Sequence, residues 1–456
     1  MAAAISTDTS EYRVVLVDPE SRGLCVLERG GEYRLIRVTV AQRTRLARQL
    51  QEALRDVWGL TVMILDCLTT DDGASPYVIA ELLHGKLPGE LRGIQLEQIP
   101  DDELSGRERV SLLAILDGDT KMPFGGIGWI DEAIAWVETA TGRRVSSKAD
   151  VEQYNAGGGF MLVRLRMEAG CDYWLKATGV PNMHERRVTS LLSKLCRGYV
   201  PEVVAERPAW NAWLMRNDGD HIVALPPEAS GVIRFLEGAV ESLAELQMRT
   251  VGSELDLLDA GAFDQRTPVL RTESEALFAY LDEAMGFQTS TKVPRIEAKR
   301  LRELQNIFED VCSYMEDWGL PDTVLHGDMN LGNILAAGER CVFIDWCEAY
   351  VGNPLVTFEH LLLLNQTEDS SLKASYDRRL RETYRSAMSK MCDPRAVDAG
   401  FACMPLLAAV SAILGRGDWL GTPLRNDPRR QTYVRGIVRH MDRAAREPAL
   451  LGTLSV

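Results

Sequence analysis

The feature that most constrains the fold of this chain is a polar segment embedded in apolar residues near position 330. The segment reads His-Gly-Asp, four further residues and Asn, and an Asp closes a following apolar run. Short apolar runs bounded by polar residues and glycines are typical of buried β-strands. The pattern therefore predicts a tight loop between buried strands, with polar side chains at the strand ends. These polar residues are His326, Gly327, Asp328, Asn333 and Asp345.

These residue types match the needs of phosphoryl transfer. Transfer of a γ-phosphoryl group needs a carboxylate that orients the attacking hydroxyl and accepts its proton, and oxygen ligands that hold Mg²⁺ on the phosphates. We predict Asp328 as the base and Asn333 and Asp345 as the metal ligands, while His326 and Gly327 shape the loop. The alternative is a polar turn between buried strands, but the complete pattern is seldom accidental.

The first quarter of the chain is predicted to form an α+β module. Its one clear helix, residues 41–58, has apolar residues at a helical period and ends before Gly59. A passage rich in Pro and Gly, residues 117–127, then leads into an amphipathic helix at residues 128–141. Strands are predicted at residues 13–17 and 24–28, which flank a hairpin turn, and at residues 33–40 and 60–68.

A small β-rich region and a large helical region follow. Three glycines, residues 157–159, separate strand-like runs, and a helix is predicted at residues 183–195. From residue 226 onward helical periodicity dominates, interrupted by a short β-like segment at residues 324–346. The strands of the β-rich region are predicted at residues 160–167, 171–177 and 212–216.

Composition excludes several classes of protein. The chain of 456 residues has 51 Lys and Arg against 66 Asp and Glu, a formal charge of −15, which disfavours nucleic acid as a partner. Its nine cysteines include no Cys-x-x-Cys pair, so we expect neither disulfides nor a zinc site. The N-terminus lacks the pattern of a signal peptide, and no uninterrupted apolar run is long enough for a membrane span. We therefore expect a cytoplasmic protein that does not bind membranes.

The polar segment resembles the catalytic and metal-binding motifs of the aminoglycoside phosphotransferase and choline kinase-like family, which shares the protein-kinase fold. The match covers about residues 151–441. The resemblance implies an α+β, bilobal protein-kinase-like fold with a small β-rich lobe and a large helical lobe, preceded by the N-terminal module. The predicted domains are residues 1–118, a connector at 119–148, the small lobe at 149–216 and the helical lobe at 217–456.

The resemblance also implies a nucleotide site for ATP, with GTP as an alternative, and Mg²⁺. Kinases of this type pair a phosphate-binding Lys with a helix Glu, and Lys176 and Glu185 are at the matching positions. Met215 lies in the strand that would contact the adenine ring. Three consecutive glycines replace the usual Gly-x-Gly-x-x-Gly loop, so a simple flexible turn is an equal alternative there. The predicted nucleotide-binding residues are Lys176, Glu185, Met215, His326, Gly157, Gly158 and Gly159.

The N-terminal module resembles a Nudix domain in its order of strands and helix. When its helix is aligned on Gly59, the positions of the paired metal-binding carboxylates are occupied by Asp56 and Val57, and those of the Arg-Glu pair by Glu52 and Ala53. Pyrophosphate hydrolysis needs clustered carboxylates to hold the divalent cation. We therefore interpret the module as a degenerate, non-catalytic Nudix-like domain.

The predicted function is transfer of the ATP γ-phosphate to a hydroxyl of a small molecule, with an antibiotic such as an aminoglycoside as the leading acceptor. The alternatives are a kinase of a primary metabolite (a choline-like amine, sugar or nucleoside), a nucleotide-binding pseudoenzyme or scaffold, a protein kinase, and a Nudix-type hydrolase. The chain lacks the Asp-Phe-Gly and Ala-Pro-Glu segments of protein kinases. The sequence leaves the oligomeric state open. For a cationic acceptor, binding carboxylates are predicted in an acidic segment, at Glu254, Asp256, Asp259 and Asp264, and a solvated acidic loop is an equal alternative for these residues.

Overall fold

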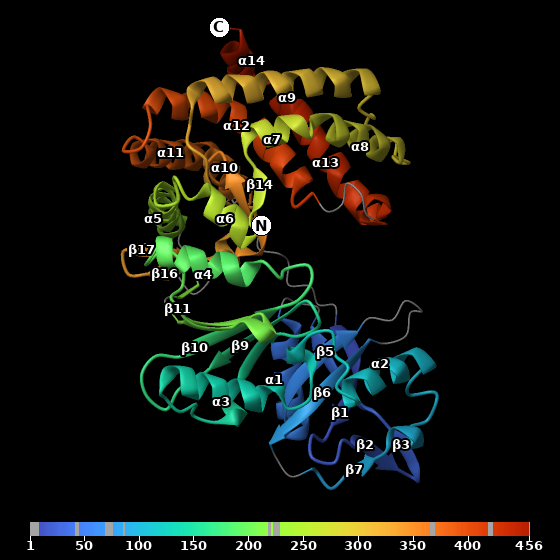
Figure 1. The fold of residues 1–456 in the computed structure, drawn as a ribbon. Helices are drawn as coiled ribbons and strands as arrows, with labels where there is room; N and C mark the ends of the chain where they lie inside the picture. The colour runs from blue at the N-terminus through green and yellow to red at the C-terminus, as the bar shows by residue number, and fades with distance from the viewer. Residues whose placement is uncertain are drawn as a thin grey trace. The chain divides into compact units, whose positions relative to one another are not determined.

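The computed structural model describes residues 9–41, 45–68, 76–84, 87–217, 220–221, 229–364, 370–417 and 423–455. The chain divides into two compact units, and Figure 1 labels many of their helices and strands. The first unit comprises Met1–Arg186 together with Glu202–Asn217, and the second comprises Arg187–Pro201 together with Asp218–Val456.

The first unit begins with a mixed sheet that has seven strands among the described residues. Its main order is β3, β2, β1, β6, β5, while β4 also pairs with β1 and β7 with β2. Strands β1 and β6 run parallel, and the other pairs are antiparallel. The strands are β1 (Thr9–Val17), β2 (Leu24–Arg29), β3 (Glu32–Arg34), β4 (Ile36–Ala41), β5 (Thr61–Leu68), β6 (Tyr77–His84) and β7 (Leu91–Ile94).

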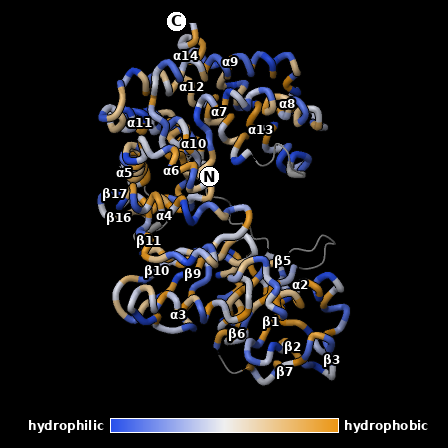
Figure 2. Tube along the Cα trace, in the orientation of Figure 1, coloured by the Kyte–Doolittle hydropathy of each residue, from blue (hydrophilic) through white to orange (hydrophobic). Residues whose placement is uncertain are grey.

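Both faces of this sheet are buried. In β1, Val14 and Leu16 point into a core shared with helix α1 (Leu46–Trp58), whereas Val15 and Val17 point into a second core on the opposite face. Figure 2 shows hydrophobic residues along β1 and β6. The second core also takes up helices α2 (Gly106–Leu116) and α3 (Trp129–Thr141).

The structure confirms several of the predicted elements of the module and corrects others. The hairpin of β1 and β2 is present, and α1 ends at Gly59 in the left-handed conformation (φ 66°), as predicted. The predicted strand 33–40 is instead divided into β3 and β4. Helix α1 begins at Leu46 and not at Ala41, which belongs to β4, and residues 42–44 of the predicted helix lie outside the described residues. Helix α2 was not predicted, because its apolar residues do not form a helical stripe.

An antiparallel five-stranded sheet completes the first unit. Its order is β11, β12, β10, β9, β8, and its inner residues share the second core with the N-terminal module. Because one core serves both parts, the module and the five-stranded sheet form a single packed body. The strands are β8 (Glu152–Asn155), β9 (Phe160–Leu165), β10 (Tyr173–Thr178), β11 (Val203–Arg207) and β12 (Ala212–Arg216).

The second unit is mainly helical, and helix α4 (Glu185–Leu195) continues into it from the first. Two small sheets have the strand orders β13, β16, β17 and β14, β18, β15. Their strands are β13 (Asp220–His221), β14 (Phe263–Gln265), β15 (Thr323–His326), β16 (Ile334–Ala337), β17 (Arg340–Phe343) and β18 (Ala349–Gly352). The helices are α5 (Ala229–Met248), α6 (Glu254–Ala260), α7 (Thr267–Thr272), α8 (Ser274–Gly286), α9 (Ala298–Trp318), α10 (Leu355–Leu364), α11 (Ser370–Met388), α12 (Pro394–Leu414), α13 (Pro428–Ala444) and α14 (Pro448–Leu454).

Helix α12 forms much of the core of this unit. Within the described residues, α12 is long and apolar enough to cross a membrane. The sequence did not predict this, because polar residues interrupt its apolar runs. Most of its residues are buried against neighbouring helices of the second unit, including Leu406, Val410 and Ile413. Burial inside a protein core accounts for the apolar character of the helix.

Candidate active site

His326, the last residue of β15, holds the start of the polar loop. Its side chain is buried, and its backbone N–H donates to Thr357 Oγ1 (2.9 Å). The ring Nδ1 accepts a hydrogen bond from the backbone N–H of Asp328 (3.2 Å), which assigns the ring proton to Nε2. Nε2 then donates to the carbonyl of Ile344 (2.9 Å), the residue before Asp345. His326 therefore ties the backbone of Asp328 to the backbone that carries Asp345.

The carboxylate of Asp328 is oriented by two side-chain amides. Oδ1 accepts a hydrogen bond from Asn330 Nδ2 (2.7 Å), and Oδ2 accepts one from Asn333 Nδ2 (3.1 Å). Neither donor carries a charge, so the hydrogen bonds fix the carboxylate without neutralising it. Asn330 was not among the predicted site residues, although it lies in the same polar segment.

Asn333 and Asp345, the predicted metal ligands, are joined through the backbone. The carbonyl of Asn333 accepts a hydrogen bond from the N–H of Ile344 (3.0 Å). Because the amide nitrogen of Asn333 donates to Asp328, its amide oxygen remains as the acceptor atom of this side chain. Asp345 has a left-handed backbone (φ 67°), which is uncommon outside glycine. One amide oxygen and one carboxylate fit Mg²⁺, which takes few protein ligands and shares phosphate oxygens.

A second carboxylate, Glu348, lies beside Asp328 and was not predicted. Burial, together with the nearby charge of Asp328, raises the pKa of Glu348. Its backbone carbonyl accepts a hydrogen bond from the N–H of Gly327 (2.8 Å). A Cβ at Gly327 would lie 2.5 Å from Cε2 of Tyr350 and 2.9 Å from Oε2 of Glu348, so only glycine fits there.

In the first unit, Lys176 and Glu185 form the predicted ion pair. Lys176 Nζ of β10 lies 2.5 Å from Glu185 Oε1 at the start of α4, and both side chains are buried. The ammonium group also lies 5.6 Å from the ring of Phe160 and 5.8 Å from that of Trp213. The contact of Lys176 with nucleotide phosphates stays a prediction.

Asn211 fixes the chain between these two residues. Its Nδ2 donates to the carbonyl of Thr178 (2.9 Å), at the end of β10, and to that of Met183 (3.1 Å), just before α4. Asn211 itself has a left-handed backbone (φ 47°). These bonds hold the connection that positions Glu185, and no local pattern in the sequence indicates them because the partners are about thirty residues apart.

Met215 and the glycine turn complete the predicted nucleotide residues of the first unit. Met215 lies in β12, and its Sδ accepts a hydrogen bond from Trp213 Nε1 (3.1 Å). The turn of Gly157, Gly158 and Gly159 connects β8 and β9, and Gly157 requires a glycine conformation (φ 118°). The carbonyl of Gly159 accepts a hydrogen bond from the N–H of Gly179 (2.8 Å).

The acidic residues predicted for a cationic acceptor are largely engaged within the protein. Asp259 pairs with Arg187 (3.0 Å) and Asp264 with Arg266 (2.6 Å). Glu254 Oε1 accepts a hydrogen bond from the backbone N–H of Gly252 (2.7 Å). These contacts favour the alternative of a solvated acidic surface.

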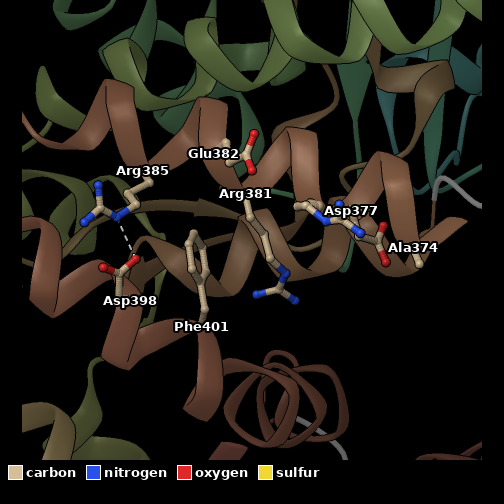
Figure 3. Close-up of a pocket in the computed structure, with 8 residues that line it drawn as sticks. Ala374, Asp377, Arg381, Glu382, Arg385, Asp398 and Phe401 are labelled. Carbon is tan, nitrogen blue, oxygen red and sulfur yellow. Dashed lines mark hydrogen bonds and ion pairs between the residues drawn. The ribbon is translucent and has the colours of Figure 1, made fainter.

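A hollow of about 360 Å³ lies between α11 and α12 of the second unit and is shown in Figure 3. Arg385 pairs there with Asp398 (2.7 Å), while the guanidinium of Arg381 lies 4.9 Å from the ring of Phe401. None of the predicted site residues line this hollow. Arg381 also pairs with the buried Glu359 (3.1 Å), so these contacts serve the packing of the helices.

Residues 164–389 match the model of the phosphotransferase enzyme family (APH). This part of the chain belongs to that family. This phosphotransferase domain has the protein-kinase-like α+β fold, with a β-rich lobe and a helical lobe. It is the domain of a small-molecule phosphotransferase with a hydroxyl acceptor. The matched range includes Lys176, Glu185 and the whole polar loop, but it begins after the glycine turn.

Solved structures similar to the chain include three phosphotransferases. A choline/ethanolamine kinase family protein from Mesorhizobium loti is 18% identical (TM-score 0.44), covering 72% of this chain and 98% of that one. A macrolide 2′-phosphotransferase from Brachybacterium faecium is 13% identical (TM-score 0.43; 67% and 96% covered). An APH(2″) enzyme in complex with GDP and kanamycin is 15% identical (TM-score 0.42; 69% and 98% covered). No curated protein matches the chain.

Proposed function

We propose that the protein transfers the γ-phosphoryl group of ATP to a hydroxyl group of a small molecule in a Mg²⁺-dependent reaction in the cytoplasm. The observation that carries this proposal is the orientation of the Asp328 carboxylate by two uncharged amides. A fixed carboxylate that pairs with no cationic side chain in the described part of the chain is suited to receive the proton of an alcohol.

In the proposed reaction Asp328 aligns the acceptor hydroxyl and takes its proton as the oxygen attacks the γ-phosphorus. The bond between that phosphorus and the bridging oxygen breaks, and ADP leaves. Lys176, held by Glu185, would neutralise charge on the α- and β-phosphates. Asn333 and Asp345 would hold Mg²⁺, which supplies positive charge to the phosphates when bound.

An antibiotic is the acceptor we propose first, because the sequence resembles aminoglycoside phosphotransferases. The paired carboxylates of the acidic segment give no preference for a cationic acceptor over a neutral one. A choline-like amine, a sugar or a nucleoside is therefore tested beside aminoglycosides and macrolides.

The test is a phosphorylation screen with the full-length protein, ATP and Mg²⁺, in which products are identified by mass spectrometry. Asp328→Asn serves as the inactive control. We expect at least one compound to gain a phosphoryl group with the unaltered protein and not with the control. If no compound raises ADP release above that of the control, the phosphotransferase proposal is wrong and a nucleotide-binding scaffold takes its place.

A further inference from the structure

The glycine turn between β8 and β9 lies against the N-terminal module. A Cβ at Gly157 would lie 3.2 Å from Oδ1 of Asp66, a residue of β5. Ala156, immediately before the turn, packs against both cores of the module. Asp66 follows a register irregularity in β5, between Ile64 and Asp66, and its Oδ1 accepts a hydrogen bond from the backbone N–H of Cys67 (2.9 Å). One end of the turn is therefore set against a side chain from outside the kinase-like lobe.

The other end of the turn is confined by the connector. Gly179, which binds the carbonyl of Gly159, approaches the turn so closely that a Cβ on it would lie 2.4 Å from the carbonyl oxygen of Gly158. The same Cβ would lie 2.9 Å from Cγ of Met122, a residue that precedes α3. Met122 thus packs at the contact between Gly179 and the turn.

The strand that leads into the turn is also attached to the module. Gln153 of β8 is fully buried, and its side chain pairs with the backbone of Ile64 in β5 at 2.8 Å and 2.7 Å. The backbone N–H of Gln153 donates to Oε1 of Gln51 in α1 (2.8 Å). Such buried bonds are costly to break, so the base of the turn cannot move independently of the module.

We propose that the N-terminal module and its connector position the glycine turn for nucleotide binding, with Asp66 of the module and Met122 of the connector as positioning residues. This rests on the proposed function, which assigns the turn to the phosphates of ATP. A turn that is ordered before ATP arrives lowers the entropy cost of binding. The proposal gives a use to a module that lacks the carboxylates for hydrolysis. It also accounts for glycine at position 157, which lies close to Asp66, and at position 179, which lies close to the carbonyl of Gly158.

The test compares two variants of the full-length protein with matched controls. Met122→Ala is compared with Ile127→Ala, because both residues belong to the connector and are partly buried against the same core. Asp66→Ala is compared with Asp18→Ala, because both carboxylates are partly buried and accept a nearby backbone N–H. If Asp66→Ala does not fold, Asp66→Asn replaces it.

Two measurements separate positioning from general stability. Without nucleotide, amide hydrogen exchange at residues 156–160 should be about tenfold faster in Met122→Ala and Asp66→Ala than in their controls. The KM for ATP should rise about five- to tenfold in these two variants with kcat unchanged. A loss of stability alone would not change the exchange at the turn or the KM for ATP more in these variants than in their controls. Exchange and KM values equal to those of the controls overturn the proposal. If exchange changes as expected but the unaltered protein neither binds nor uses ATP, the module still braces the turn and the proposed function fails instead.

Discussion

At the scale of single residues, Asp328 is the side chain whose chemistry can be isolated most directly. Asp328→Asn keeps the volume of the side chain but replaces one acceptor oxygen by a donor group. Since Asn330 and Asn333 both donate to this position, one of them loses its partner. We expect kcat to fall about 100-fold or more, with the KM for ATP changed only a few-fold, in steady-state kinetics. Turnover like that of the unaltered protein would remove Asp328 from the mechanism.

Asp322, just before β15, gives a prediction about pH. Burial and the carboxylates of Glu254 and Asp264 raise its pKa to about 6, against the opposing effect of Arg266. The folded state thus holds this proton more tightly than the unfolded state, where the pKa is about 3.9. The resulting stability is present below about pH 4 and is lost as the pH rises through about 6.

Removing the ionisable group should therefore stabilise the protein only at higher pH. We expect Asp322→Asn to raise Tm by about 3 °C at pH 7.5 and to leave it unchanged near pH 4. Thermal denaturation across this range measures the effect. The exposed Asp317, at the end of α9, provides the control Asp317→Asn. A change in Tm that does not depend on pH, or that Asp317→Asn also shows, would contradict the raised pKa of Asp322.

The sequence predicts the residues of the polar loop better than their surroundings. Asp328, Asn333 and Asp345 were recognisable in the sequence because they lie five and twelve residues apart in one short segment between apolar runs. Glu348 and Asn211 were not, because their importance depends on which distant residues they contact in the folded chain. Candidate residues that lie together in one short segment can be predicted from the sequence, whereas contacts between distant segments cannot.

At the scale of secondary-structure elements, the attachment of β8 to β5 and α1 relies on a buried amide network. Gln153→Ala removes the partners of both backbone groups of Ile64 and leaves them buried. An unsatisfied buried group costs about 1–3 kcal/mol, so we expect a loss of about 3 kcal/mol in the free energy of unfolding, visible in denaturant or thermal unfolding.

Gln98→Ala provides the comparison, because Oε1 of Gln98 accepts one exposed hydrogen bond, from the N–H of Gln95. That variant should lose less than about 1 kcal/mol. Equal losses in the two variants would show that the buried network does not hold the strand in place.

Periodicity explains which elements were predictable. Helix α1 places Leu50 and Leu54 on one face, and α3 has a comparable apolar stripe, so both were found. Helix α2 instead buries Glu108, which pairs with Arg13 of β1 (2.6 Å). Because Glu108 occupies a buried position of α2, the helix has no continuous apolar stripe that would predict it from the sequence. Its position depends on contacts with distant residues such as Arg13.

At the scale of the whole molecule, the N-terminal module and the five-stranded sheet share one hydrophobic core within the first unit. Their joining surface is rich in aromatic rings. Trp129 and Trp136 of α3 lie edge-on to Trp210, with ring centroids 5.6 Å and 6.0 Å apart. The division of this region into a Nudix-like domain and a kinase-like small lobe stays a prediction, but the core makes their stabilities interdependent.

Removal of residues 1–142 would leave the apolar face of the five-stranded sheet, including Val163 and Leu214, without its cover. A large exposed apolar patch promotes association, so we expect the truncated protein to aggregate in size-exclusion chromatography and to lose a cooperative thermal transition. Co-expression of residues 1–142 as a separate chain should restore solubility, because the covering surface is supplied again. A truncated protein that is monomeric, soluble and as active as the full chain would show that the kinase-like lobe is stable without the module.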